Sequence, residues 1–296
     1  MKYSFKKVND KIIKPIEVHH PDVKNILGHE IVPLQHAIIF ACGRKGSGKT
    51  NIVKTLMEEC INKETNVIVF CSTHNSDKNW LKIKEWLEKK EQPHYFMQSI
   101  FEDGISNIEV LVDKIMNDHS AKQEMLKAEK SNKKKKATKK PAIDMFGDFV
   151  EPEPTVKKKK SKMIAPEYFI VLDDISGELR SKKNVQILLK KHRHIDSKIV
   201  ISSQFPNDLD PASRAQVDIW CLYKGFGKDK IEDIFPQLDM RNIDFEDFYN
   251  IYNDVTKVKH NFLYIDRNNN IMRKNFDQEI ILPILKEDEA QWDNRS

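Results

Sequence analysis

Glycine is scarce in this chain, with nine among 296 residues, so a cluster of glycines is informative. Cysteine is scarcer, and the four positions, Cys42, Cys60, Cys71 and Cys221, lack the spacing of a zinc site. We expect them to be reduced core thiols of an intracellular protein. Long apolar runs are also missing, since residues 168–172 and similar stretches are far too short to cross a bilayer. The sequence therefore predicts no insertion into a membrane.

Arginine is rare too, at eight of the 50 basic residues, and the net charge of +5 is unevenly distributed. Residues 122–162 contain fourteen lysines against six acidic residues, a net charge of +8 that leaves about −3 for the rest of the chain. The apolar pattern dissolves there, which predicts a disordered, lysine-rich insertion. Three roles stay open for it: contact with DNA phosphates, a nuclear-import sequence, or a solvated loop.

Elsewhere, short apolar segments alternate with longer amphipathic ones. Strands are expected at residues 36–42, 66–71, 94–97, 168–174, 198–204, 217–223 and 261–266. Helices are expected near residues 51–60, 80–87, 105–115, 184–191, 228–235 and 244–252, and the tryptophans of the second of these, Trp80 and Trp86, are assigned to the core. The alternation predicts an α/β fold with a largely parallel central sheet flanked by helices.

The few glycines gather where the first strand ends, in a complete Walker A motif. Phosphate oxygens must be met closely by backbone N–H groups, which glycine allows because it lacks a Cβ. Lys49 supplies positive charge to the β and γ phosphates, and Thr50 offers a hydroxyl to Mg²⁺. The motif predicts that the chain binds ATP with Gly43, Arg44, Lys45, Gly46, Ser47, Gly48, Lys49 and Thr50.

Two consecutive acids, Asp173 and Asp174, end the apolar segment that begins at residue 168, in the form of a Walker B strand. The first acid would lie in the Mg²⁺ shell and the second would orient the attacking water. The same pair could instead cap the following helix. Gln204 ends the next strand and has the form of a γ-phosphate sensor, although it could also be a loop glutamine without a role.

The order of these motifs resembles the genome-packaging ATPases of large DNA viruses, the poxvirus-type branch of the FtsK/HerA superfamily of P-loop ATPases. The resemblance rests on four segments: residues 43–50, 169–174, 192–196 leading into 202–204, and 213–214. It covers roughly residues 36–226, and a weaker similarity extends to residues 260–266. It implies a RecA-like fold, a homo-oligomeric ring, and ATP-driven translocation of double-stranded DNA into a capsid. None of these three follows from composition or spacing.

The resemblance assigns Lys49 and Thr50 to the phosphates and metal, Asp173 to Mg²⁺, Asp174 to the activation of water, and Gln204 to the sensor. Most cellular translocases of the superfamily have Glu in the place of Asp174, so this aspartate departs from them and fits the viral branch.

A ring also implies an arginine that a neighbouring subunit supplies to the transferring phosphoryl group, because a guanidinium can bridge two phosphate oxygens. Arg214, just after the sensor strand, is the first choice, and Arg193, just before it, is the second. The alternative for Arg214 is a salt bridge with Asp210 or Asp218.

We expect an N-terminal extension at residues 1–33, a P-loop ATPase core at 34–224 that includes the basic insertion, and a C-terminal helical and strand segment at 225–296. The resemblance implies a DNA-packaging motor whose partners are double-stranded DNA and viral capsid proteins. It places the protein in the virion or in a viral factory of the host cytoplasm, with the nucleus as an alternative. The other candidates are a cellular or plasmid FtsK/HerA-type translocase and a nucleotide-binding structural or adaptor protein.

Overall fold

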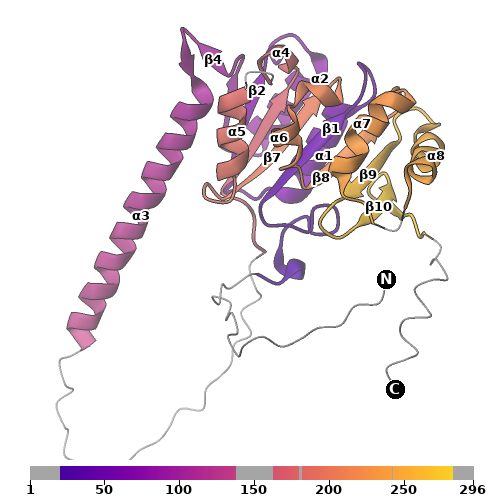
Figure 1. The fold of residues 1–296 in the computed structure, drawn as a ribbon. Coiled ribbons are helices and arrows are strands. Elements are labelled where there is room, and N and C mark those ends of the chain that lie inside the picture. The colour runs from indigo at the N-terminus through magenta and orange to yellow at the C-terminus, as the bar shows by residue number, and fades with distance from the viewer. Residues whose placement is uncertain (1–20, 138–162, 180–181, 242, 283–296) are drawn as a thin grey trace, which may run out of the picture.

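A nine-stranded sheet forms the centre of the molecule. The computed structural model describes residues 21–137, 163–179, 182–241 and 243–282 (Figure 1). The strands of the main sheet are β1 (Ala37–Cys42), β2 (Asn66–Cys71), β3 (His94–Met97), β6 (Tyr168–Asp173), β7 (Ser197–Ser203), β8 (Ile219–Tyr223), β9 (Phe262–Asp266), β10 (Ile271–Lys274) and β11 (Gln278–Glu279). Their order is β11-β10-β9-β8-β1-β7-β6-β2-β3.

The six strands from β8 to β3 in this order pair in parallel, and β9, β10 and β11 continue the same sheet in antiparallel pairs. The described part of the segment after residue 224 thus adds strands to the sheet of the core. A separate short hairpin joins β4 (Phe101–Glu102) to β5 (Ile105–Ser106). The predicted α/β fold of a P-loop NTPase, with a largely parallel central sheet flanked by helices, is confirmed.

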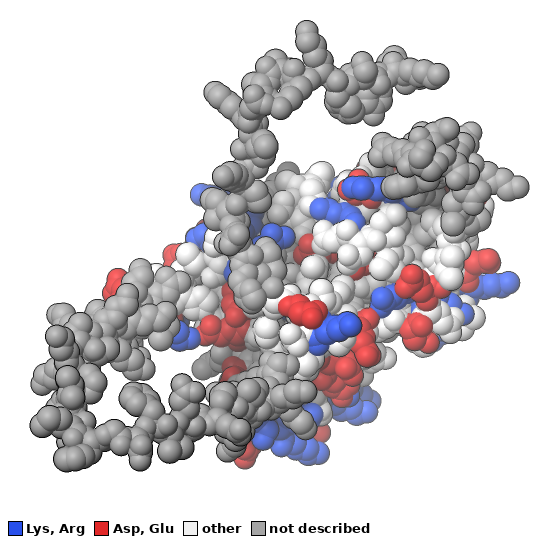
Figure 2. All heavy atoms as spheres, turned by 90° about the horizontal axis from the view of Figure 1, so that it is seen from below, with Lys and Arg blue, Asp and Glu red and all other residues white. Residues whose placement is uncertain are grey.

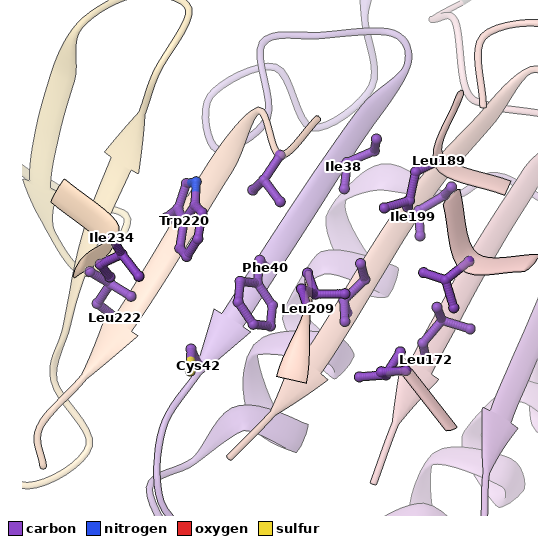
Figure 3. Packing of buried hydrophobic residues seen from close by; sticks show 14 of the residues in the cluster. Ile38, Phe40, Cys42, Leu172, Leu189, Ile199, Leu209, Trp220, Leu222 and Ile234 are labelled. Carbon is purple, nitrogen blue, oxygen red and sulfur yellow. The ribbon is translucent and has the colours of Figure 1, made fainter. Parts of the chain in front are cut away.

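Helices cover both faces of the sheet (Figure 1). They are α1 (Lys49–Cys60), α2 (Lys78–Lys89), α3 (Asn107–Ala137), α4 (Ser176–Leu179), α5 (Lys182–Lys191), α6 (Pro211–Arg214), α7 (Lys228–Leu238) and α8 (Phe245–Thr256). The alternating residues of β1 explain the two layers, since every residue of this strand is buried. Ile38, Phe40 and Cys42 join the cluster formed with α3, α5, α7 and α8 (Figure 3), and Ile39 joins the cluster with α1 and α2.

Helix α3 corrects one expectation. Residues 122–137, assigned to a disordered insertion, continue this helix to Ala137, and Figure 1 shows it projecting beyond the body of the molecule. Lysine, alanine and glutamate are good helix formers, so low hydrophobicity removed the apolar pattern without removing the helical preference. The beginning of the helix is buried, and Lys122 pairs with Glu167 at 2.5 Å beside β6. The rest of the predicted insertion, residues 138–162, lies outside the described residues.

All four cysteines are buried and none forms a disulfide. Of the helices that the structure describes, none has both the length and the apolar character that crossing a membrane requires.

Candidate nucleotide-binding site

A cavity of about 420 Å³ lies where β1, β6 and β7 end. The carboxyl ends of parallel strands meet at one edge of a sheet, and ligands bind in the crevice outside this edge. The pairing register places Asp173 of β6 opposite Ser202 of β7, and Cys42 of β1 opposite Ser203. Residues 45–51 of the P-loop and the start of α1, the two acids, and residues 202–204 therefore line one cavity.

The three glycines of the loop have different physical tasks. Gly46 and Gly48 adopt φ of +75° and +110°, a left-handed region that favours glycine. Gly48 is also the N-cap of α1 and makes no side-chain cap, so the first amides of this helix are free to bind an anion. A Cβ on Gly43 would lie 2.5 Å from Cβ of Tyr223, so close packing of the loop against β8 requires glycine there.

Lys49 lies inside the curve of this loop. Its Nζ donates to the carbonyl oxygen of Gly43 at 2.6 Å and to that of Arg44 at 3.3 Å. Burial lowers the pKa of the ammonium from its ordinary value, and the nearby Asp173 carboxylate opposes this shift. The loop therefore surrounds a partly desolvated cation, as the binding of phosphate oxygens requires.

Asp173 ends β6 and is buried, with 5% of its surface exposed. Burial raises the pKa of this carboxyl, while the nearby Ser202 hydroxyl, the Trp80 indole and the Lys49 ammonium lower it. Nε1 of Trp80 donates to Oδ2 of Asp173 at 2.7 Å. An indole N–H is only a donor, so it stabilises the ionised carboxylate that a divalent cation requires.

The residue that follows it, Asp174, is exposed and has a left-handed backbone, with φ of +54°. The Ser72 hydroxyl donates to its backbone oxygen at 2.9 Å, and the Thr73 hydroxyl lies 3.4 Å from Oδ2. Among the described residues, no hydrogen bond joins either acid to the first amides of α4, so the pair does not cap this helix. The carboxylate instead lines the cavity.

Hydroxyl groups complete the wall of the cavity. Oγ of Ser47 is buried and has no hydrogen-bond partner in the described part of the chain, whereas the Ser202 hydroxyl lies beside the Asp173 carboxyl. Buried polar atoms are normally paired, so the Ser47 hydroxyl fits a polar ligand. Together with the P-loop amides, Lys49 and Asp173, it fits a triphosphate with Mg²⁺, which Thr50 and Asp173 would hold. Gln204 lines the same cavity.

The structure does not bring Arg193 or Arg214 to this cavity. The Arg214 side chain is 5% exposed, and its Nη1 donates to Oδ1 of Asn207 at 2.6 Å and to Oδ2 of Asp233 at 3.2 Å. The alternative partners expected from the sequence are wrong, because Asp210 caps α6 and Asp218 accepts the backbone N–H of Ile38. Arg193 is exposed and precedes β7, at the opposite end of the strand from Gln204.

Sequence reasoning missed two contributors. Trp80 was assigned to the core, where it is indeed buried, but an indole among apolar residues also needs an acceptor, and Asp173 supplies it. His260 reaches the site from the turn before β9, with its Nδ1 3.0 Å from the carbonyl oxygen of Ser47. In the sequence, the only indication of a role for His260 was the weaker similarity to the viral ATPases at residues 260–266.

No protein family and no curated protein matches this chain in sequence. Among solved structures, it is similar to the genome packaging NTPase B204 from Sulfolobus turreted icosahedral virus 2 in complex with AMP. The identity is 13%, the TM-score is 0.45, and the match covers 84% of this chain and 100% of that one. The same protein has been solved with ATP-gammaS and with AMPPCP.

Two further structures extend this comparison. B204, the DNA-packaging ATPase from Sulfolobus turreted icosahedral virus, shows 14% identity and a TM-score of 0.45, with coverage of 84% of this chain and 100% of that one. The cytoplasmic domain of the type VII secretion ATPase EccC from Thermomonospora curvata shows 17% identity and a TM-score of 0.36, with coverage of 66% and 21%. These similarities are distant and concern the fold alone.

Proposed function

We propose that this protein is an ATPase whose ATP hydrolysis drives the packaging of double-stranded viral DNA into a capsid. The ATPase part rests on one observation: Lys49, Asp173 and Asp174 line the same cavity, which also contains the unpaired hydroxyl of Ser47. The packaging part is supported by the order of the motifs in the sequence, which resembles that of viral genome-packaging ATPases.

The residues divide the work between binding and reaction. The P-loop amides and Lys49 hold the phosphates, and Thr50 and Asp173 hold Mg²⁺, which neutralises charge on the β and γ oxygens when bound. Asp174, exposed at the cavity, orients the attacking water and accepts its proton. The Gln204 amide can bond both a phosphate oxygen and this water.

The ring that we propose would place a subunit interface beside the cavity, and an arginine of the neighbouring subunit would complete the site. Because Arg214 is buried in an ion pair, the exposed Arg193 becomes the better candidate for this role. Double-stranded DNA, other copies of this chain and capsid proteins are the proposed partners, in the virion or a viral factory.

The test is an ATPase assay with and without double-stranded DNA, combined with electron microscopy of the particle. Stimulation by DNA in ring-shaped particles, lost in Lys49→Ala, would support the motor. Slow turnover that DNA does not change would support the nucleotide-binding adaptor instead. A cellular or plasmid translocase would share the stimulation, so assembly with the viral capsid must separate that alternative.

A further inference from the structure

A second cavity, of about 400 Å³, lies on the other side of the P-loop from the two acids. It is lined by P-loop residues 44–47, by residues 223–225 at the end of β8, and by Lys257 and residues 259–261 before β9. In the sheet order, β8 and β9 lie on one side of β1, whereas β7 and β6 lie on the other. The two cavities share residues 45–47 and His260, so they are two halves of one surface around the loop.

The second cavity is strongly cationic. Five of its lining residues are Arg44, Lys45, Lys224, Lys257 and Lys259, and no carboxylate lines it. Across the described ranges of the chain, none of the five forms an ion pair with an acidic side chain. Lysines and arginines that gather without acids create a local positive potential, which attracts a polyanionic nucleotide as a whole.

Arg44 has a fixed place in this cavity. Gly225 has φ of +123°, and a Cβ there would lie 2.8 Å from Nε of Arg44 and 2.9 Å from its Cδ. The arginine side chain therefore lies directly on the bare backbone of Gly225. This arginine lines the second cavity and not the first, unlike its neighbour Lys45, which lines both.

The position of the acids sets the direction of a bound nucleotide. Asp173 and Asp174 need the terminal phosphate beside them, at the ends of β6 and β7. The phosphate chain then follows the loop around Lys49, and the rest of the nucleotide leaves on the side of β8 and β9. We propose that the second cavity binds the nucleoside half of the nucleotide, with the guanidinium plane of Arg44 against a face of the base. This inference rests on the nucleotide site of the proposed function.

The experiment compares the binding of two probes, ATP and inorganic tripolyphosphate, each with Mg²⁺, by calorimetry on the full chain. Tripolyphosphate fills the phosphate cradle but carries no nucleoside. Arg44→Ala should weaken ATP about tenfold and leave tripolyphosphate unchanged. Arg44→Lys keeps the charge but loses the plane, so it should weaken ATP to a similar extent. Lys63→Ala, an exposed lysine outside both cavities, controls for the change in net charge.

The outcomes separate this inference from the function on which it rests. If wild-type protein binds neither probe, the nucleotide site itself is wrong. Parallel loss of both probes in Arg44→Ala, or full rescue by Arg44→Lys, would show that Arg44 acts as a charge on the phosphates and would overturn the nucleoside assignment. Unchanged binding of both probes in Arg44→Ala would also overturn it.

Discussion

Charged groups after β1 and at the end of β6 are used differently in this fold from those of α6. Around the P-loop, Lys49, Asp173 and Asp174 line a cavity, and the nearby Ser47 hydroxyl has no partner among the described residues. Around α6, the Arg214 guanidinium is buried and donates to two side chains of its own subunit. Both regions are rich in polar residues in the sequence, but the charged groups of the first line a cavity, whereas Arg214 is enclosed by its own chain. This difference separates a binding site from a structural ion pair.

Substitution of the exposed acid should have the largest effect on the P-loop side. Asp174→Asn preserves the size of the side chain but cannot accept the proton of water, so kcat should fall by roughly 10²–10⁴-fold while ATP still binds. Steady-state turnover and calorimetric ATP binding measure the two parts. Lys49→Ala is the matched control that should lose binding as well. Unchanged turnover in Asp174→Asn would remove this residue from its role as the base.

On the α6 side, we expect substitution to lower the stability of the protein. Arg214→Ala removes a buried guanidinium and leaves Asn207 without its donor, so the free energy of unfolding should fall by about 2 kcal/mol. Urea denaturation measures this loss. Asp233→Asn, which changes only the half-exposed partner, should cost less. Full stability of Arg214→Ala would mean that the ion pair is not structural.

A mixing experiment tests which of the two arginines, Arg193 or Arg214, acts across a subunit interface. If Arg193 acts across a subunit interface, inactive Arg193→Ala and inactive Lys49→Ala should partly recover activity when they co-assemble, because some interfaces then combine an intact cradle with an intact arginine. ATPase activity of the mixture is the measurement. Recovery with Arg214→Ala in place of Arg193→Ala would instead restore Arg214 as the arginine that acts in trans.

The contrast also shows what the sequence could predict. The cradle around Lys49 and the acid at Asp173 are local patterns, in which strand, loop and helix follow one another in the chain, so their positions could be predicted together. Trp80 and His260 reach the site from α2 and from the turn before β9, and only the tertiary fold brings them there. The partner of Arg214 was predicted wrongly for the same reason, since Asp233 is supplied by α7.

Helix α3 is a separate case, because low hydrophobicity was the wrong criterion for predicting disorder in residues 122–137. Low hydrophobicity indicates that a segment cannot form a core, but it does not exclude a helix when the residues are lysine, alanine and glutamate. The helix is anchored at its start by buried apolar residues and at its middle by the Lys122–Glu167 pair, so the described part of the predicted insertion has an ordered base.

A smaller effect is expected from the hydrogen bond that links α2 to the metal acid. Trp80→Phe removes the donor to Asp173, and the apparent affinity for Mg²⁺ should fall about tenfold, with kcat nearly restored at saturating Mg²⁺. Trp86→Phe is the matched control, since it makes the same change on the same helix without contact with the acid. Equal effects of both substitutions would indicate general damage to α2.

The pH dependence of the same variant gives an independent readout. Burial raises the pKa of Asp173, and the Trp80 hydrogen bond opposes this shift by stabilising the ionised form. Without the indole, the carboxyl should gain its proton at higher pH, so Mg²⁺-dependent turnover should fall earlier on acidification. Profiles of kcat/KM against pH measure this shift. An unchanged acidic limb would mean that Asp173 does not control it.

The smallest effect concerns the lysine-rich residues beyond α3, which contain neither Walker motif. Replacing Lys139, Lys140 and residues 157–160 with glutamine should leave basal ATP hydrolysis nearly unchanged. If these lysines contact DNA phosphates, each lost contact should reduce the slope of log affinity against log salt by about one. Binding of a labelled duplex at several salt concentrations measures the slope. An identical slope in the glutamine variant would leave the nuclear-import and solvated-loop alternatives, because an electrostatic contact cannot lose its charges and keep its salt dependence.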